Sequence, residues 1–145
     1  MKYRSITRGL FCLLLLLAAC ATREPGPEEL RSKRFETVPD KAVVYLYRDL
    51  LDFSNNPTTL TLDGQSLGST YPGTYYRLEL PPGRHRIAGF AGDAGAVVFD
   101  TQPGKLYFMR HVVSRLLAFD QSFFHFVGEI QGRNSVSRYE LLGAP

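Results

Sequence analysis

The chain has 145 residues, with 17 Lys and Arg against 14 Asp and Glu, which gives a formal net charge of +3 at pH 7. Three of the basic residues lie between Lys2 and Arg8, so the remainder holds 14 charges of each sign and is formally neutral. This balance gives no case for nucleic acid or anionic lipid as a partner. The two cysteines, Cys12 and Cys20, lie near the N-terminus, so the rest of the chain has no thiol for a disulfide.

The N-terminal segment has the order of a secretory signal. Lys2, Arg4 and Arg8 precede an apolar run over Leu10–Leu17, and small residues follow that run. A membrane-spanning helix needs about 20 apolar residues, and this run is much too short. The segment therefore predicts export, and one alternative is an ordinary secretory signal that is cut near Ala21.

The small residues end on a cysteine, in the order Leu17-Ala18-Ala19-Cys20, and this tetrapeptide resembles the lipobox of bacterial lipoproteins. The resemblance implies that residues 1–19 are removed by cleavage between Ala19 and Cys20, and that the Cys20 thiol carries a diacylglyceryl group. Each buried methylene contributes about 0.8 kcal/mol, so two or three acyl chains anchor a protein stably. In that class, a residue other than aspartate after the cysteine implies sorting to the outer membrane. Ala21 stands there, so in a two-membrane bacterium we expect a lipid-anchored protein on the periplasmic face of the outer membrane. In a single-membrane bacterium the same signal would leave the domain outside the cell membrane.

Residues 20–40 are predicted to form a flexible tether between this anchor and a domain over residues 41–145. The stretch contains Pro25, Pro27 and Pro39, many charges and few apolar residues, so little burial would compensate for ordering it. A flexible chain of this length spans on the order of 25 Å. Within it, the segment from Pro27 to Arg34 has the proline-first, acid-early and base-late order of a short helix. Such a short helix is marginal in water on its own.

From residue 42 onward, apolar residues alternate with period two and turn residues interrupt them, which indicates strands. In chain order, the first of these elements are a strand at Ala42–Tyr47, a strand at Leu60–Leu62, a two-residue hairpin turn at Asp63-Gly64, a return strand ending at Gly68, and a turn at Tyr71-Pro72-Gly73. The Asp-Gly pair is the strongest of these signals, because its turn requires positive φ at both residues.

The segment from Thr74 to Phe90 is predicted to be a β-hairpin closed by Pro82-Gly83, in which proline fixes φ and glycine tolerates the left-handed region. A two-residue turn there would pair Leu80 with His85, Glu79 with Arg86 and Leu78 with Ile87. Leu78, Leu80, His85 and Ile87 would then face the core. The predicted role of His85 is to bind a neighbouring loop by hydrogen bonds and so fix the hairpin.

Further strands are predicted at Ala96–Thr101, Leu106–Val113 and Phe123–Ile130. The last segment is open between two structures. One is a short helix capped by Asn134 or Ser135 and ending at Gly143, and the other is a final strand through Val136. Short strands with frequent Gly and Pro turns predict an all-β fold, namely a single small β-sandwich of about seven antiparallel strands.

Four segments of this domain carry a resemblance. They are Ala42–Arg48, Leu62–Gly64, Leu80–His85 and Gly104–Phe108. In order and spacing they resemble a family of short bacterial lipoproteins that carries the label "domain of unknown function". The Leu-x-Leu-x-Pro-Gly-x-His stretch is also similar to PEGA-type repeats, which are small β-sandwich modules of bacterial surface proteins. Both resemblances imply a sandwich without known catalytic activity, and neither supplies functional residues.

Three histidines, His85, His111 and His125, lie outside the signal, but none has a second ligand type at the spacing of a zinc motif. Each is more simply interpreted as a half-buried strand histidine bonded to backbone, so we predict no metal and no cofactor. The sequence has no Gly-x-Ser-x-Gly elbow, no glycine-rich phosphate loop and no cysteine left as a nucleophile. Loop aspartates are more often turn formers than catalytic acids. We therefore predict that the protein is not an enzyme.

Aromatic residues are the better lead to function. Tyr71, Tyr75 and Tyr76 cluster at one turn, and the stretch Phe119–Phe126 is unusually apolar. Such groups fill a core, or they form a contact patch for another envelope protein or for the membrane beside the anchor. The leading hypothesis is a non-enzymatic envelope lipoprotein that binds a protein partner or supports an envelope assembly, with strand edges that accept another strand. The alternative is a ligand-binding module for glycan, lipid or metal, which would use these tyrosines or the histidines.

Overall fold

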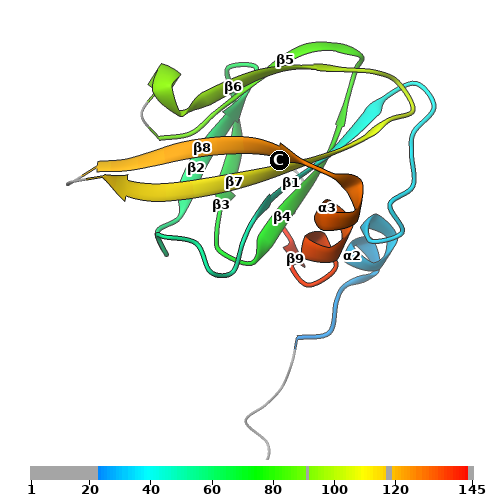
Figure 1. The fold of residues 1–145 in the computed structure, drawn as a ribbon. Helices are drawn as coiled ribbons and strands as arrows, with labels where there is room; N and C mark the ends of the chain where they lie inside the picture. Colours follow the sequence, from blue (N-terminus) through cyan, green and yellow to red (C-terminus); the bar gives the residue numbers. More distant parts are fainter. Residues whose placement is uncertain (1–22, 91, 117–118, 144–145) are drawn as a thin grey trace, which may run out of the picture.

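The computed structural model describes residues 23–90, 92–116 and 119–143. Over these residues the chain forms two β-sheets that pack face to face, with two short α-helices outside them (Figure 1). The five-stranded sheet has the strand order β8-β7-β1-β4-β9, and the four-stranded sheet has the order β3-β2-β5-β6. The elements are α2 (Pro27–Ser32), β1 (Ala42–Arg48), β2 (Thr58–Leu62), β3 (Gln65–Thr70), β4 (Thr74–Leu80), β5 (Gly83–Ala88), the 3-10 helix η2 (Gly92–Gly95), β6 (Ala96–Thr101), β7 (Leu106–Leu116), β8 (Phe119–Val127), α3 (Glu129–Val136) and β9 (Glu140–Leu141). The predicted small all-β sandwich with a short C-terminal helix is confirmed.

β1 is the central strand of the larger sheet and is buried on both faces, from Ala42 to Arg48. Its β-branched and aromatic residues suit a pleated surface that packs on both sides. β1 pairs antiparallel with β4 and parallel with β7, and β9 runs parallel to β4. The described residues thus form nine strands with two parallel pairings, where about seven antiparallel strands were expected. β6 belongs to the smaller sheet and β7 to the larger one, so the chain crosses between the sheets before β7. β7 can therefore run parallel to β1, its neighbour in the sheet.

The main hydrophobic core lies between the two sheets. Leu78, Leu80, His85 and Ile87 are all buried there, as predicted. Their predicted strand pairing is wrong, however, because β4 pairs with β1 and β9 while β5 pairs with β2 and β6. The turn at Pro82-Gly83 therefore crosses from one sheet to the other and does not close a hairpin of paired strands. The apolar sides of β4 and β5 face the same core whether the two strands pair in one sheet or lie in opposite sheets. The alternation of apolar residues alone therefore could not distinguish a hairpin from a crossing between sheets.

The predicted pairing of Glu79 with Arg86 fails for the same reason. Glu79 lies opposite Val43 of β1, and its carboxylate accepts a hydrogen bond from Arg77 of its own strand. By contrast, the Asp63-Gly64 turn joins β2 to β3 as predicted, with φ of 51° and 82° at its two residues. Local turn chemistry was sufficient there because the two strands are neighbours in one sheet.

The C-terminal part resolves the helix-or-strand alternative. β8 ends at Val127, and Gly128 in extended conformation precedes α3, so the strand predicted to reach Ile130 is three residues too long. The helix begins at Glu129, earlier than a cap at Asn134 would allow, and a two-residue strand, β9, follows it. α3 lies close against β7 because Gly132 faces Phe108, where a β-carbon would come within 2.2 Å of the ring.

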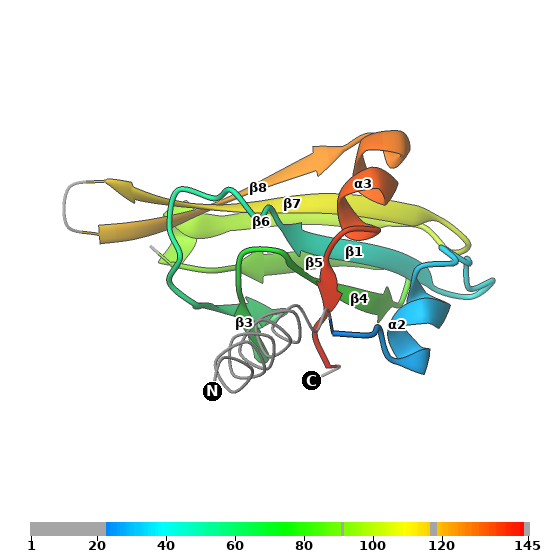
Figure 2. The same cartoon turned by 90° about the horizontal axis from the view of Figure 1, so that it is seen from below.

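Both helices cover the outer face of the five-stranded sheet, away from β5 and β6 (Figures 1 and 2). This corrects the prediction of a flexible tether for the part of residues 20–40 that follows Pro27. Phe35 is buried in a second hydrophobic cluster with Tyr45 and Tyr75. The Tyr75 hydroxyl lies 2.6 Å from Ser32 Oγ, and the Tyr45 hydroxyl donates to the Ser32 carbonyl at 2.6 Å. Tertiary contacts thus stabilise α2, which its own length could not do.

Candidate interaction site

Two of the predicted site residues, Ala19 and Cys20, lie outside the described residues. The other predicted positions, Pro82, Gly83 and His85 around the β4–β5 turn, lie within the described residues. His85 is buried, with its Nδ1 at 2.7 Å from Asp63 Oδ2 and its Nε2 at 2.9 Å from the Pro81 carbonyl oxygen. Burial alone would lower the pKa of His85, but these hydrogen bonds outweigh it and the pKa is raised. His85 thus joins the Pro82-Gly83 corner to the β2–β3 turn.

The other two histidines lie on opposite faces of the larger sheet. His111 is fully buried on the inner face, with Nδ1 at 3.0 Å from Thr70 Oγ1 and Nε2 at 3.0 Å from Ser122 Oγ. Burial, and to a smaller extent the charge of Arg48, lowers the pKa of His111 to about 3. His125 is exposed on β8. Across the part of the chain that the structure describes, no group of three or more His, Cys, Asp or Glu is arranged to hold a metal ion.

The tyrosine cluster does not form an exposed platform. Tyr75 and Tyr76 are buried, at 0% and 5% exposure, whereas Tyr71 is 46% exposed. Burial raises the pKa of the Tyr75 hydroxyl to about 12, against the opposing effect of its hydrogen bond with Ser32. Core filling accounts for two of the three tyrosines, and the ligand-binding alternative loses most of its expected surface.

The loop after β1 is held by a charged residue that the sequence pattern did not single out. Arg48 is fully buried, and its Nε donates to Asp52 at 2.5 Å while its terminal nitrogens donate to the carbonyls of Ser54 and Asn56. Asp52 in turn accepts a hydrogen bond from the Val113 backbone N–H at 3.0 Å. A buried guanidinium is stable only when acceptors pair with its N–H donors. Asp52, Ser54 and Asn56 supply these acceptors, so the loop after β1 folds around Arg48.

Because Asp52 points inward, its apolar neighbours point outward. Leu50, Leu51 and Phe53 are 65%, 91% and 79% exposed, and we call these three residues the apolar loop. Large apolar side chains at such exposure, in adjacent positions, are typical of an interaction site. The buried Arg48–Asp52 pair holds this loop in one conformation. Binding of a partner therefore does not have to compensate for the entropy cost of ordering the loop.

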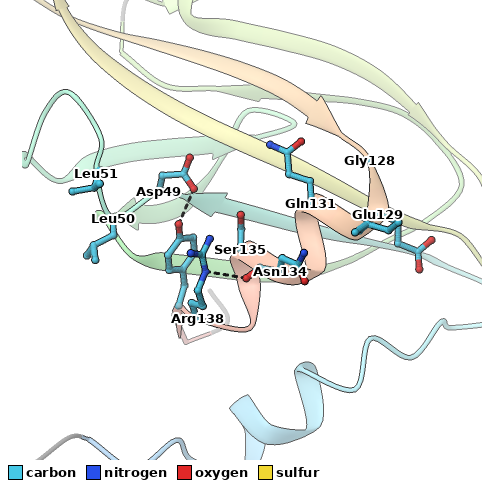
Figure 3. A pocket seen from close by; sticks show the side chains of 11 residues that line it. Asp49, Leu50, Leu51, Gly128, Glu129, Gln131, Asn134, Ser135 and Arg138 are labelled. Atoms are coloured by element: carbon cyan, nitrogen blue, oxygen red, sulfur yellow. Dashed lines mark hydrogen bonds between the residues drawn. The ribbon is translucent and has the colours of Figure 1, made fainter.

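A groove of about 1090 Å³ lies between the apolar loop and α3 (Figure 3). Ile130, 80% exposed, and Gln131 contribute to the helical wall, and Asp49 lies at the base. The Asp49 carboxylate accepts a hydrogen bond from the Tyr139 hydroxyl at 2.7 Å and pairs with Arg110 at 2.7 Å. The charge of Asp49 is therefore paired within the protein, and the groove combines the apolar side chains of Leu50, Leu51 and Ile130 with a polar lining from α3.

The second exposed apolar surface is the edge of the larger sheet. β8 has one strand neighbour, β7, and both strands extend past the rest of the sheet (Figure 2). On β8, Phe119, Phe123 and Phe126 are 77%, 39% and 46% exposed. An apolar edge strand offers unpaired backbone groups together with side-chain anchors, and proteins normally protect such an edge with charge, bulges or a covering segment. The backbone N–H of Ser122 reaches the Phe90 carbonyl at 3.4 Å, which covers one position of this edge.

A scan of protein-family models and a search of curated proteins found no match to this chain. The resemblances to bacterial lipoproteins and PEGA-type repeats therefore stay predictions. Within the described ranges, none of the helices has both the length and the apolar character needed to cross a membrane.

Proposed function

We propose that this protein is a lipid-anchored lipoprotein of the bacterial cell envelope that binds a protein partner without catalysing a reaction. The exposed β8 edge carries the proposal. It presents nine residues in extended form, with Phe119 and Phe123 as apolar anchors and few charges to discourage pairing. A partner segment that adds a strand to such an edge gains main-chain hydrogen bonds and pockets for alternate side chains. The order of the N-terminal residues around Cys20 supports the anchor.

β6 provides a matched control, because it is the edge strand of the other sheet. Its outward residues include Val98, which is 47% exposed, followed after one buried position by the exposed Asp100. Charge on an edge strand opposes further pairing. β8 and β6 thus differ in exposed aromatic side chains and in the exposed charge of Asp100, which are the two properties that the proposal invokes.

The test is photocrosslinking in cells with a photoreactive phenylalanine analogue in the full-length protein. The analogue replaces Phe119 or Phe123 in two variants and Val98 in the control. We expect a discrete crosslinked partner from the β8 positions, identified by mass spectrometry, and no such product from Val98. The same abundant neighbours at all three positions would contradict a partner site on β8. Fatty-acid labelling that persists in Cys20→Ala would contradict the anchor.

A further inference from the structure

The folded domain begins very close to the predicted anchor. Arg23 pairs with Glu140, with 2.7 Å between Nη1 and Oε2. Two residues, Ala21 and Thr22, lie between Cys20 and Arg23. An extended chain covers at most about 3.6 Å per residue step, and three steps join the two positions, so a lipid on Cys20 starts within roughly 11 Å of Arg23. With this pair formed, a bilayer that holds the lipid lies near the surface around Glu140, and not a full tether length away.

The apolar loop belongs to that same surface. The backbone N–H of Glu140 donates to the Gly73 carbonyl at 3.0 Å. Leu50 packs against Gly73, with its Cδ1 3.0 Å from the place of a β-carbon on that glycine. Tyr71, half exposed, lies in the same turn, since its carbonyl accepts a hydrogen bond from Thr74. Gly73 thus contacts both Leu50 and Glu140, and Glu140 is the ion-pair partner of Arg23.

The side chains displayed there suit a membrane interface. Leu51 and Phe53 are the two most exposed members of the apolar loop, and Tyr71 has the amphipathic ring that gathers at the level of lipid headgroups. Leu51 and Phe53 carry no charge, so the attraction that they supply does not depend on basic residues. The Arg48–Asp52 pair holds the loop in place, so insertion requires no prior folding.

We propose that the apolar loop inserts into the bilayer surface that carries the anchor, so that lipid and loop together fix the orientation of the domain. This inference rests on the lipid anchor in the proposed function. The loop acts as a second contact beside the acyl chains, and the β8 edge stays free for a partner. The apolar loop contacts lipid, not a protein partner.

The cysteine content allows a direct test, because a cysteine placed in the domain is the only free thiol once Cys12 is removed and Cys20 is lipidated. Leu51→Cys in the full-length protein is labelled with a polarity-sensitive fluorophore and reconstituted into phosphatidylethanolamine–phosphatidylglycerol vesicles. Phe53→Cys is the second probe, and Val98→Cys on the smaller sheet is the control. Each label is then exposed to a nitroxide quencher attached to lipid and to a water-soluble quencher.

We expect at least twofold stronger quenching by the lipid-attached nitroxide at positions 51 and 53 than at position 98, with blue-shifted emission. Fatty-acid labelling of the same samples reports the anchor. A lipidated protein whose labels at 51 and 53 are as open to the aqueous quencher as the label at 98 overturns loop insertion and leaves the anchor intact. Labels shielded in cells but open in vesicles indicate a protein occupant and also overturn it. Absence of fatty acid overturns the anchor and the loop inference together.

Discussion

Arg48 and His85 each tie a loop to a sheet through a carboxylate, yet the two ion pairs have different surroundings. The side chains of Arg48 and Asp52 are 0% and 2% exposed, whereas those of His85 and Asp63 are 6% and 45% exposed. Arginine keeps its charge at every accessible pH, so its buried site needs a full set of acceptors. Histidine can lose its proton, and Asp63 remains in contact with water. The first site is therefore a permanent structural element, and the second responds to pH.

The largest expected effect comes from removing the permanent charge. Arg48→Met removes the guanidinium donors from the carbonyls of Ser54 and Asn56 and from the Asp52 carboxylate, which keeps only backbone N–H donors such as that of Val113. Breaking a buried pair in this way costs about 3–5 kcal/mol of unfolding free energy. Urea unfolding of the full-length protein, followed by circular dichroism, measures the loss. Adding Asp52→Asn should recover part of it, because no uncompensated charge then remains, and a loss below about 1 kcal/mol in the single variant would contradict this account.

An intermediate effect is expected at His111. Thr70 connects it to Arg48, because Thr70 Oγ1 lies 3.0 Å from His111 Nδ1 and the Thr70 carbonyl accepts a hydrogen bond from Arg48 at 3.4 Å. Its lowered folded pKa, about 3, keeps the ring neutral in the native state, while the unfolded chain takes up a proton below about pH 6.5. The unfolded state then binds more protons, so stability falls as pH falls, by about 1.4 kcal/mol per pH unit. Relative to wild type, His111→Gln should gain about 2 kcal/mol between pH 7 and pH 5. A difference that is constant over this range would mean that His111 takes up its proton over the same pH range in the folded protein as in the unfolded chain.

The smallest effect, with the opposite sign, is expected at His85. Its folded pKa is raised, so the stabilisation is complete below about pH 6.5 and is lost as pH rises through the folded pKa. His85→Gln should cost about 1 kcal/mol at pH 6 and less at pH 9. Asp63→Asn should cost a similar amount at pH 6. The loss in the double variant should be smaller than the sum of the single losses, because the His85–Asp63 pair is shared, while the hydrogen bonds of His85 with Pro81 and of Asp63 with the Arg86 backbone N–H are separate. Additive losses in the double variant would show that the two side chains act separately.

Local patterns predicted the elements whose neighbours are close in sequence. Alternation located β1 and β6, and Asp63-Gly64 defined the turn between β2 and β3. The same signals could not assign strands to sheets, because a Pro-Gly turn that crosses the core resembles one that closes a hairpin. The parallel pairing of β1 with β7 depends on that assignment, so it was also beyond local reasoning.

The parts of the candidate site that were missed depend on contacts between distant segments. Leu50, Leu51 and Phe53 have the composition of core residues, and their exposure follows from Asp52 turning inward to Arg48. The available signal was a single arginine at the end of an otherwise apolar strand. β8 was located in part, but its edge position depends on sheet order, which composition does not report.

The packing of α2 sets the smallest fragment with which the domain can be handled in solution. A fragment that starts at Lys41 would lose Ser32 and Phe35 and would present the rings of Tyr45 and Tyr75 to water. Aromatic surface of this kind promotes aggregation. A soluble version should therefore start between Cys20 and Pro27, so that the residue proposed to carry the lipid is removed while the helix and its hydroxyl contacts are kept.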